Sequence, residues 1–498
     1  MKLKTLFAKP FANYIYSRIS KDRLHAVEDQ EIIMKQIVKS ARNTLFGKDH
    51  DFASIKSYED FRERVPINDY EGLKKYIDLI KEGKQHILWK GKPIYFAKTS
   101  GTTSGVKYIP ITKDSIANHI NTARDSLLCY IAQTGKADFT SGKMIFLSGS
   151  PTLERVGGIP TGRLSGIVNH HIPRYLRSNQ LPSFETNCIE DWETKLDKII
   201  EETLGQNMTL ISGIPPWMQM YFDRLQEKTG KTIADIFPGL SLIVQGGVNF
   251  EPYKKRLFES IGKKIDYIEL YPASEGFIAF QDCLENEGLL LNTNSGIFFE
   301  FIPTEEFMNE NPTRISLKDV EIGKNYVLII NSNAGLWGYN LGDTIKFVST
   351  NPYRIQVTGR VRHFISAFGE HVISEEVDEA LMKAAEEKNV KVVEFTVAPK
   401  VQNTDGKSYH EWFIEFEKIP EDLDSFATIL DQNLRKKNVY YDDLISGNIL
   451  DCLHIRPIHK NGFIEYMRSI NKLGGQNKLP RLSNDRALAD ALEPFILS

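Results

Sequence analysis

The sequence lacks long apolar runs and has no marked excess of charge of either sign. Among its 498 residues, 62 are Lys or Arg and 65 are Asp or Glu, which gives a formal net charge of -3. A nearly neutral chain has no overall field to hold a nucleic-acid backbone or an anionic membrane. No segment approaches the roughly 20 apolar residues that cross a bilayer. We therefore expect small-molecule partners, with no nucleic acid and no membrane among them.

Cysteine is also scarce. The four cysteines are scattered and form no C-x-x-C pair: Cys129, Cys188, Cys283 and Cys452. This spacing argues against a zinc or dithiol motif and predicts reduced, mostly buried thiols. Near the start, Lys9 and Pro10 interrupt the apolar residues that a signal peptide would need. We expect a cytoplasmic protein; the oligomeric state stays open, with a monomer slightly favoured.

The sequence does have enough apolar residues to build sizeable cores. It is 41% hydrophobic and 26% charged, within the range of globular proteins. A chain of this length is too long for one core and predicts two or more lobes. Ile33, Ile37, Ala41 and Leu45 recur every four residues and predict an amphipathic helix that is capped by Gly47.

Strands and helices alternate over the first half of the chain. Short apolar or β-branched runs predict strands that begin near Lys143, Met208, Leu240 and Ile265. From about residue 289 the chain becomes rich in strands, and its last part combines a helix around residues 377–384 with two more strands. We predict an α/β protein: a large N-terminal lobe of layered sheets and helices (1–359) with a β-rich subdomain, and a small α+β C-terminal lobe (360–498).

A loop rich in glycine and hydroxyl groups carries the first chemical signal. It runs TSGTTSGVK from Thr99 to Lys107, between two apolar runs. Its glycines let the backbone approach a ligand, while its amides, hydroxyls and Lys107 can bind phosphate oxygens. The Walker order is absent. A plain surface loop is the alternative, but the flanking strands and Lys107 favour a triphosphate.

Four further segments follow strands or turns. The paired glycines of Gln245–Asn249 would let a flat ring lie against the backbone, and Tyr271–Glu275 offers an aromatic ring, a hydroxyl and a carboxylate that could hold Mg²⁺. Asp343 follows a glycine turn and could bind ribose hydroxyls, and Arg360 could reach ribose or phosphate. Each segment alone could be an ordinary turn, but all five in this order are hard to obtain by accident.

These five segments resemble the nucleotide-binding motifs of the adenylate-forming superfamily over about the whole chain. The forms TSGTTSGVKYIPIT and YPASEG, together with the tail Gly475–Arg481 (GQNKLPR), are more closely similar to the auxin-responsive family of acyl acid amido synthetases. The resemblance implies the adenylate-forming enzyme fold and the use of ATP and Mg²⁺. It also implies that a carboxylic acid is activated as acyl-AMP, with release of pyrophosphate, and then joined to the amine of an amino acid.

The resemblance also implies roles for single residues. Glu275 would hold Mg²⁺, and Lys107 and the mobile Lys478 would be catalytic. Arg362 would be the hinge of the small lobe, although the wider superfamily commonly has Asp or Lys there. The nucleotide-binding residues would be Ser100, Gly101, Thr102, Thr103, Ser104, Gly105, Gly246, Gly247, Val248, Tyr271, Ser274, Asp343 and Arg360.

Two other functions stay open. An acyl-CoA synthetase would keep the adenylation and use coenzyme A as acceptor, and a regulatory protein would bind the nucleotide without catalysis. The sequence identifies neither the acyl acid substrate nor the base that deprotonates the amine. Trp217, Met218 and Phe250 could line an acid pocket at the strand ends, but they would serve equally well as core.

Overall fold

The computed structural model describes residues 2–100, 106–172, 177–189, 191–247, 250–361, 364–365, 372–401, 408–446, 450–473, 478–483 and 485–497. The chain divides into two compact units. Unit 1 comprises Met1–Phe250, Leu257–Leu341 and Ile345–Val357, and unit 2 comprises Glu251–Arg256, Gly342–Thr344 and Thr358–Ser498. The division at 359/360 into a fixed and a mobile lobe stays a prediction.

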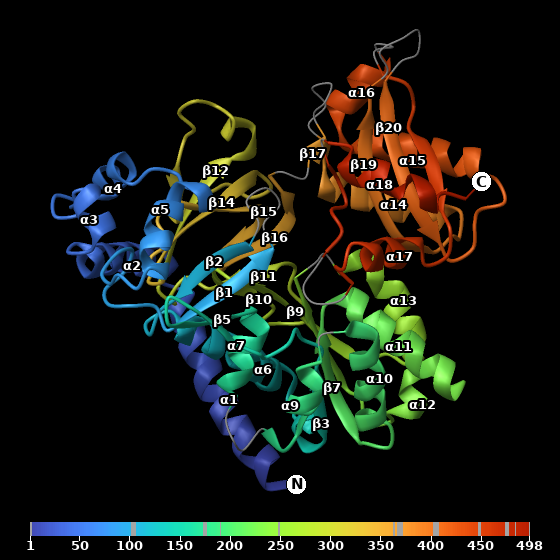
Figure 1. Ribbon diagram of the computed structural model, residues 1–498, viewed down its shortest axis with the longest axis horizontal. Helices are drawn as coiled ribbons and strands as arrows, with labels where there is room; N and C mark the ends of the chain where they lie inside the picture. The colour runs from blue at the N-terminus through green and yellow to red at the C-terminus, as the bar shows by residue number, and fades with distance from the viewer. Residues whose placement is uncertain are drawn as a thin grey trace. The chain divides into compact units, whose positions relative to one another are not determined.

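A large mixed sheet is the centre of unit 1 (Figure 1). Its strands lie in the order β13 (Ile315–Ser316), β12 (Ile297–Pro303), β14 (Asn325–Ser332), β15 (Tyr339–Thr350), β16 (Tyr353–Arg360), β11 (Leu289–Leu291), β10 (Gly276–Phe280), β9 (Asp266–Ala273), β8 (Leu242–Gly246), β7 (Met208–Gly213), β3 (Lys143–Phe146) and β6 (Gln180–Leu181). The neighbours from β6 to β9 are parallel, and β9, β10 and β11 pair antiparallel. A second sheet has the order β2 (Val106–Ile111), β1 (Tyr95–Ser100), β5 (Ile159–Gly162) and β4 (Glu154–Val156).

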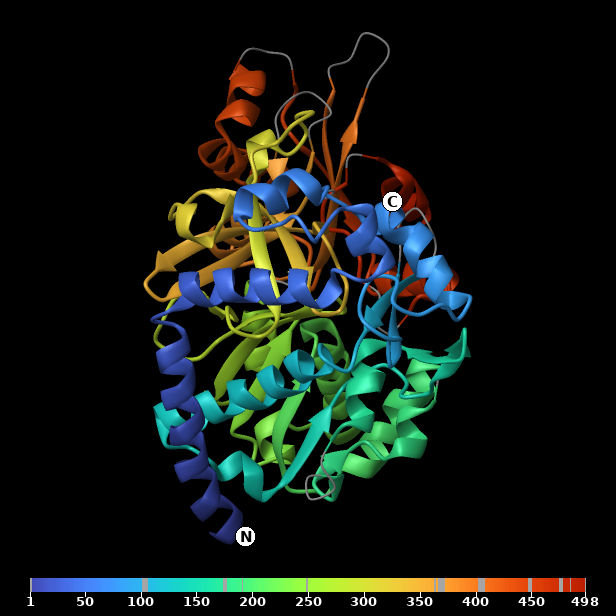
Figure 2. The ribbon, with the colours of Figure 1, turned by 90° about the vertical axis from the view of Figure 1, so that its left-hand side faces the viewer.

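Helices cover these sheets. The helices of this part of the chain are α1 (Lys2–Asp22), α2 (Ala26–Ala41), α3 (Leu45–Asp49), α4 (Tyr58–Arg64), α5 (Tyr70–Lys81), α6 (Ile116–Thr134), α7 (Leu164–His170), α9 (Phe184–Asn187), α10 (Trp192–Thr203), α11 (Pro215–Thr229), α12 (Ile233–Ile236) and α13 (Glu251–Ile261). In Figure 2, α2 runs across β12, which it contacts, and α6 lies in front of the parallel strands. Leu242 and Val244 of β8 share one apolar cluster with residues of α1 and α6. Tertiary packing therefore buries the parallel strands as the apolar runs predict.

Unit 2 is a small α+β unit. It contains the three-stranded sheet β19 (Val392–Lys400), β20 (Tyr409–Phe416) and β21 (His454–Ile458), the pair β17 (Phe364–Ile365) and β18 (Val372–Ile373), and helices α14 (Ser374–Glu387), α15 (Leu423–Lys437), α16 (Val439–Ser446), α17 (Gly462–Ser469) and α18 (Ala487–Leu492). Trp412 and Ile414 of β20 pack in one cluster with α14 and α15, while the intervening Phe413 packs in another with α17 and α18. This alternation places helices on both faces of the sheet.

The predicted strands and the helix around residues 377–384 are confirmed, but two local predictions are wrong. Helix α2 ends at Ala41, so the predicted helix stops before Leu45. Gly47 lies inside α3, and the Thr44 side chain caps α3 by accepting a hydrogen bond from the Gly47 N–H at 3.0 Å. The apolar periodicity continues across the break because α2 and α3 both contribute apolar residues to the same core, Phe46 among them. The cysteines are unpaired, yet only Cys129 is buried.

No helix in the described part of the chain combines the length and apolar character needed to cross a membrane.

Candidate nucleotide site

The predicted phosphate loop joins β1 to β2. These strands pair antiparallel as far as Thr99 opposite Lys107 and Ser100 opposite Val106, so the hairpin holds the two ends of the loop side by side. The remaining predicted loop residues lie outside the described part of the chain: Gly101, Thr102, Thr103, Ser104 and Gly105. What the structure does describe is therefore the base of the loop and Lys107.

Lys107 lies beside an aromatic ring of α5. Its Nζ is 5.9 Å from the centroid of the Tyr70 ring, within the range of a cation–π contact. The Tyr70 hydroxyl accepts a hydrogen bond from the Tyr108 backbone N–H at 3.0 Å. Burial raises the pKa of Tyr70, so the phenol stays neutral and its ring remains a favourable neighbour for the ammonium. Tyr70 thus ties α5 to β2 next to the loop.

Glu275 occupies the tight turn between β9 and β10, where Ala273 pairs with Gly276. Its Oε1 accepts a hydrogen bond from the Tyr339 hydroxyl at 3.5 Å. Tyr339 is the first residue of β15 and is only 2% exposed. Burial, and then the negative charge of Glu275, raise the pKa of Tyr339 well above its ordinary value. Tyr339 therefore keeps its proton and donates a hydrogen bond to the carboxylate.

The segment before α5 links these two groups. The Asn340 N–H donates to the Asn68 carbonyl at 2.7 Å, and the Asn68 N–H donates to the Gly338 carbonyl at 2.7 Å. This bridge pairs Asn68, two residues before Tyr70, with the start of β15 at Tyr339. One buried phenol, Tyr70, thus lies beside Lys107 and another, Tyr339, lies beside Glu275, and the Asn68 bridge joins the segments that carry the two phenols.

Glu275 fits a magnesium ion that arrives with a nucleotide. The described residues contain no group of three or more His, Cys, Asp or Glu side chains that could form a complete metal cage. Mg²⁺ typically binds through one or two protein carboxylates and takes its other ligands from phosphates and water. One carboxylate that the Tyr339 hydroxyl orients is therefore a suitable protein donor for Mg²⁺.

The glycine pair follows β8 directly. Gly246 is opposite Leu270 of β9, and a Cβ at Gly246 would lie 2.4 Å from the Leu270 carbonyl oxygen. Gly247 has φ +87°, a left-handed conformation that favours glycine. Tyr271, the residue after Leu270, is 7% exposed, and Ser274 shares the β9–β10 turn with Glu275. Val248 lies outside the described residues.

The predicted ribose residues belong to neighbouring strands. Asp343 is on β15 and is 7% exposed, and Arg360 ends β16, the next strand of the sheet. The Thr358 hydroxyl donates to the Thr344 hydroxyl at 3.0 Å, and the Val361 N–H donates to the Gly342 carbonyl at 2.8 Å. Strand pairing thus brings the backbones of Asp343 and Arg360 together. The hinge residue Arg362 lies outside the described part of the chain.

Lys478 is exposed and belongs to the tail that follows α17. The residues after it are anchored on β19: the Thr396 hydroxyl donates to the Pro480 carbonyl at 2.7 Å, and the Val397 N–H donates to the Arg481 carbonyl at 3.0 Å. An exposed lysine next to an anchored segment suits a group that must reach a substrate. Its catalytic role stays a prediction.

The proposed acid-pocket residues are packed in the interior. Trp217 is 4% exposed, Met218 0% and Phe250 1%. The Trp217 ring packs on Trp192 with centroids 4.8 Å apart, and Phe250 packs on Tyr267 at 4.9 Å. These contacts account for all three side chains as core, so a role in binding an acid stays a prediction.

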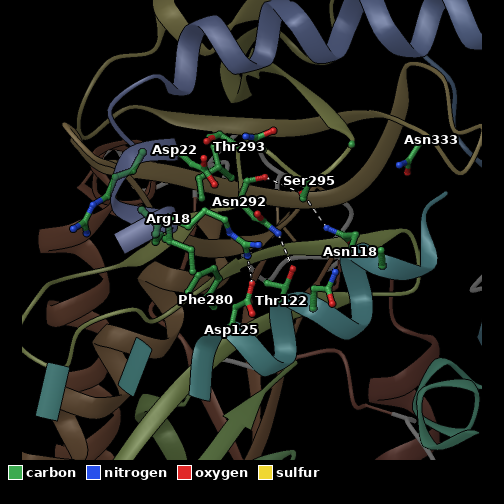
Figure 3. Close-up of a pocket in the computed structure, with 18 of the residues that line it drawn as sticks. Arg18, Asp22, Asn118, Thr122, Asp125, Phe280, Asn292, Thr293, Ser295 and Asn333 are labelled. Carbon is green, nitrogen blue, oxygen red and sulfur yellow. Dashed lines mark hydrogen bonds and ion pairs between the residues drawn. The ribbon is translucent and has the colours of Figure 1, made fainter. Parts of the chain in front are cut away.

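A separate cavity of about 460 Å³ lies between α1, α6 and the loop after β11 (Figure 3). Its polar side chains bind one another: Arg18 pairs with Asp125 at 2.8 Å, Asn118 donates to Ser295 at 3.0 Å, and Asn292 donates to the Thr122 hydroxyl at 2.8 Å. None of the described residues predicted for the nucleotide site lines this cavity. Because these six side chains pair with one another and no predicted nucleotide residue lines the cavity, we do not assign it to the nucleotide.

Family matches run in order along the chain. Residues 15–187 match the GH3 family N-terminal domain, residues 290–360 the GH3 family central domain, and residues 375–487 the GH3 family C-terminal domain. The chain belongs to the GH3 family. The family predicted from the sequence motifs is thereby confirmed.

Curated relatives of this GH3 chain match it over most of their length. The jasmonoyl–L-amino acid synthetase JAR4 of Nicotiana attenuata is 22% identical over 91% of this chain and 90% of its own. The indole-3-acetic acid-amido synthetase GH3.3 of Arabidopsis thaliana is 21% identical over 94% of this chain and 91% of its own. The first is named as an amino acid synthetase and the second as an amido synthetase.

Solved structures confirm the predicted fold. The GH3.15 acyl acid amido synthetase superposes with a TM-score of 0.80, at 15% identity, over 97% of this chain and 96% of its own. The 2-hydroxyisobutyryl-CoA ligase superposes with a TM-score of 0.56, at 12% identity, over 96% of this chain and 91% of its own. The GH3 chain therefore has the mixed α/β fold of adenylate-forming enzymes.

Two residues of this site were not selected from the sequence. Tyr339 is the first residue of the motif that contains Asp343, but nothing in the sequence indicates that its side chain contacts Glu275. Tyr70 stands outside every motif, at the start of α5. Only the sheet order and the Asn68 bridge bring both phenols to Lys107 and Glu275.

Proposed function

We propose that this GH3 chain is an ATP-dependent acyl acid amido synthetase of the cytoplasm. It activates a carboxylic acid as acyl-AMP and then transfers the acyl group to the amine of an amino acid. The observation that carries the proposal is that Tyr70 lies beside Lys107 and Tyr339 beside Glu275, on segments that the Asn68 backbone bridge holds together. The names of the relatives support the same chemistry.

The first step joins two anions, so its barrier is mainly electrostatic. A carboxylate oxygen attacks the α-phosphorus of ATP, and the bond to pyrophosphate breaks. Lys107 offsets charge on the triphosphate, while Tyr339 orients the Glu275 carboxylate by donating to it. Mg²⁺ held by Glu275 would supply further positive charge at the phosphates.

The second step forms the amide. A neutral amine attacks the acyl carbon, AMP leaves with the electron pair of the broken C–O bond, and the nitrogen loses a proton. Asp343 and Arg360 would hold the ribose and its phosphate during both steps, and Lys478 would approach the α-phosphate in the first.

Replacing Lys478 tests the assignment. We expect Lys478→Ala to lower acid-dependent exchange of pyrophosphate into ATP by about a hundredfold or more, since it removes charge needed in the transition state. Its thermal unfolding should not change because Lys478 is exposed. Lys472→Ala, an exposed lysine after α17, is the matched control.

The same assay tests the proposed function itself. Carboxylic acids are screened by exchange, and active acids are then tested for acyl transfer to amino acids or coenzyme A. If no acid of a broad panel supports pyrophosphate exchange, the protein does not adenylate these acids and the proposal is contradicted. Exchange followed by transfer to coenzyme A alone contradicts the amido synthetase.

A further inference from the structure

Three parallel strands end side by side next to the glycine pair. Phe146 of β3 is opposite Ser212 of β7, and Gly213 of β7 is opposite Gln245 of β8. Ligands of α/β sheets bind beyond such carboxyl ends. Five residues beyond or beside the end of β3 form what we call the strand-end cluster: Ser148, Arg163, Asn187, Trp192 and Lys195.

Lys195 is a buried cation that forms no ion pair with any described residue. It is 3% exposed, and its Nζ donates to two backbone carbonyls, Ser148 O at 2.9 Å and Asn187 O at 2.8 Å. An ammonium has three N–H donors, so these two carbonyls leave one donor over. Burial lowers the pKa of Lys195 to about 8, and the charge of Arg163 contributes in the same direction.

Arg163 is the second cation of the cluster. It is half-buried, directly before α7, and its side chain packs so closely on Gly149 that a Cβ there would lie 2.7 Å from Arg163 Cδ. Within the described part of the chain it forms no ion pair and no hydrogen bond through its guanidinium. Burial lowers the pKa of Arg163 as well.

Elsewhere the chain neutralises its buried arginines. Arg314 pairs with Glu300 at 2.5 Å and Arg354 pairs with Asp282 at 2.6 Å, with both arginine side chains 5% exposed. A buried charge without a partner is costly. Two neighbouring cations that pair with no carboxylate in the described part of the chain therefore indicate a place where an external anion supplies the missing charge.

Uncharged groups at the same strand ends are also unsatisfied. Among the residues that the structure describes, Asn187 Oδ1, Trp192 Nε1 and both polar atoms of the Gln245 side chain are buried and have no hydrogen-bond partner. Asn187 and Gln245 are each 1% exposed. Such groups are normally paired, so the donors and acceptors here suit a ligand that has both an anion and an N–H group.

We propose that the strand-end cluster binds the α-carboxylate of the amino-acid acceptor. This inference rests on the proposed function. The carboxylate of the acyl acid loses its charge when it becomes acyl-AMP, and the triphosphate is served by the phosphate loop. The α-carboxylate of the acceptor keeps its charge from binding to product release, and it is therefore the substrate anion that needs a lasting counter-charge.

The test compares Arg163→Gln with the unmodified enzyme in both half-reactions. We expect the KM for amino acids to rise about ten- to a hundredfold, because one of two cations facing the carboxylate is lost. The KM for the corresponding amino-acid amides, which have no carboxylate, should change less than twofold. Lys195→Met should raise the KM for amino acids in the same way. The matched control is Lys198→Met, because Lys198 is an exposed lysine of the same helix, α10, and pairs with Glu201.

Three results would overturn the inference. One is an equal rise in KM for amino acids and their amides, and another is no change in either. The third is a rise in the KM for ATP during pyrophosphate exchange, which would assign the cations to the nucleotide. Failure of the proposed function is distinct, because the unmodified enzyme would then show no acid-dependent exchange at all.

Discussion

At the scale of single residues, burial decides which titratable groups are neutral. Tyr339 can orient Glu275 because its phenol is protonated, and the raised pKa keeps it so even at alkaline pH. Burial also keeps the imidazole of His119 in α6 neutral, but it does so by lowering its pKa. It is 3% exposed, its Nδ1 has no hydrogen-bond partner, and burial lowers its pKa to about 4.

His119 should make the protein sensitive to acid. Because its pKa is lower in the folded than in the unfolded state, its contribution to stability is present above pH about 6.5 and is lost as the pH falls towards about 4. We expect the stability of the unmodified protein, relative to His119→Leu, to fall by about 2–3 kcal/mol across this window. Urea unfolding at several pH values measures this difference.

The exposed His25 provides the comparison for this effect. His25→Gln should keep the acid sensitivity of the unmodified protein. A His119→Leu variant whose unfolding free energy falls with pH as steeply as that of the unmodified protein would contradict the explanation.

At the scale of elements, close strand pairing sets the shape of the nucleotide site. β8 and β9 pair from Leu242 opposite Asp266 to Gly246 opposite Leu270, and the last pair leaves no room for a side chain. The hairpin of β1 and β2 has the same effect on the phosphate loop, since it holds Lys107 opposite Thr99. Backbone geometry, rather than any single side chain, therefore positions both motifs.

Gly246→Ala should separate β8 from β9 at the site. Its Cβ would meet backbone 2.4 Å away, which cannot move without disturbing the strand pair. We expect a loss of about 2 kcal/mol in unfolding free energy and at least a tenfold weaker binding of ATP. Chemical denaturation and calorimetric titration measure the two effects.

Gly135→Ala is the control for this substitution. Gly135 caps α6 at φ +68° with nothing within 4 Å of its Cβ position, so we expect a cost of about 1 kcal/mol and no change in ATP affinity. Equal ATP affinities in Gly246→Ala and the unmodified protein would show that the pairing of β8 and β9 does not shape the site.

At the scale of the whole molecule, each unit has its own hydrophobic core. Trp337 is fully buried in unit 1 and packs on Phe46 with centroids 6.0 Å apart. Trp412 is fully buried in unit 2 and packs on Phe395 at 6.1 Å. Units with separate cores need not unfold in one cooperative step.

Calorimetry should therefore resolve two unfolding transitions. Trp→Ala in a core costs about 3–5 kcal/mol. We expect Trp412→Ala to lower one transition by roughly 10 °C and Trp337→Ala to lower the other. If both substitutions lower a single common transition, the two units unfold together.

The sequence by itself determined the chemistry and the local elements. The motif order pointed to the family, apolar periodicity located the strands and α14, and residue types named Lys107, Glu275 and Asp343 as candidates. These features are local, because side-chain type and short-range spacing are enough to recognise them. The break between α2 and α3 was missed because both helices present apolar residues to one core.

Only the tertiary structure decided which distant residues meet. The order of the sheet and the Asn68 bridge bring Tyr70 and Tyr339 to the site, and the ends of parallel strands lie beside Arg163 and Lys195 without a carboxylate. No local pattern indicates such contacts, because they depend on strand order and on which buried charges find partners. The chain pairs its buried arginines Arg314 and Arg354 with carboxylates, so two cations that pair with no described carboxylate are informative.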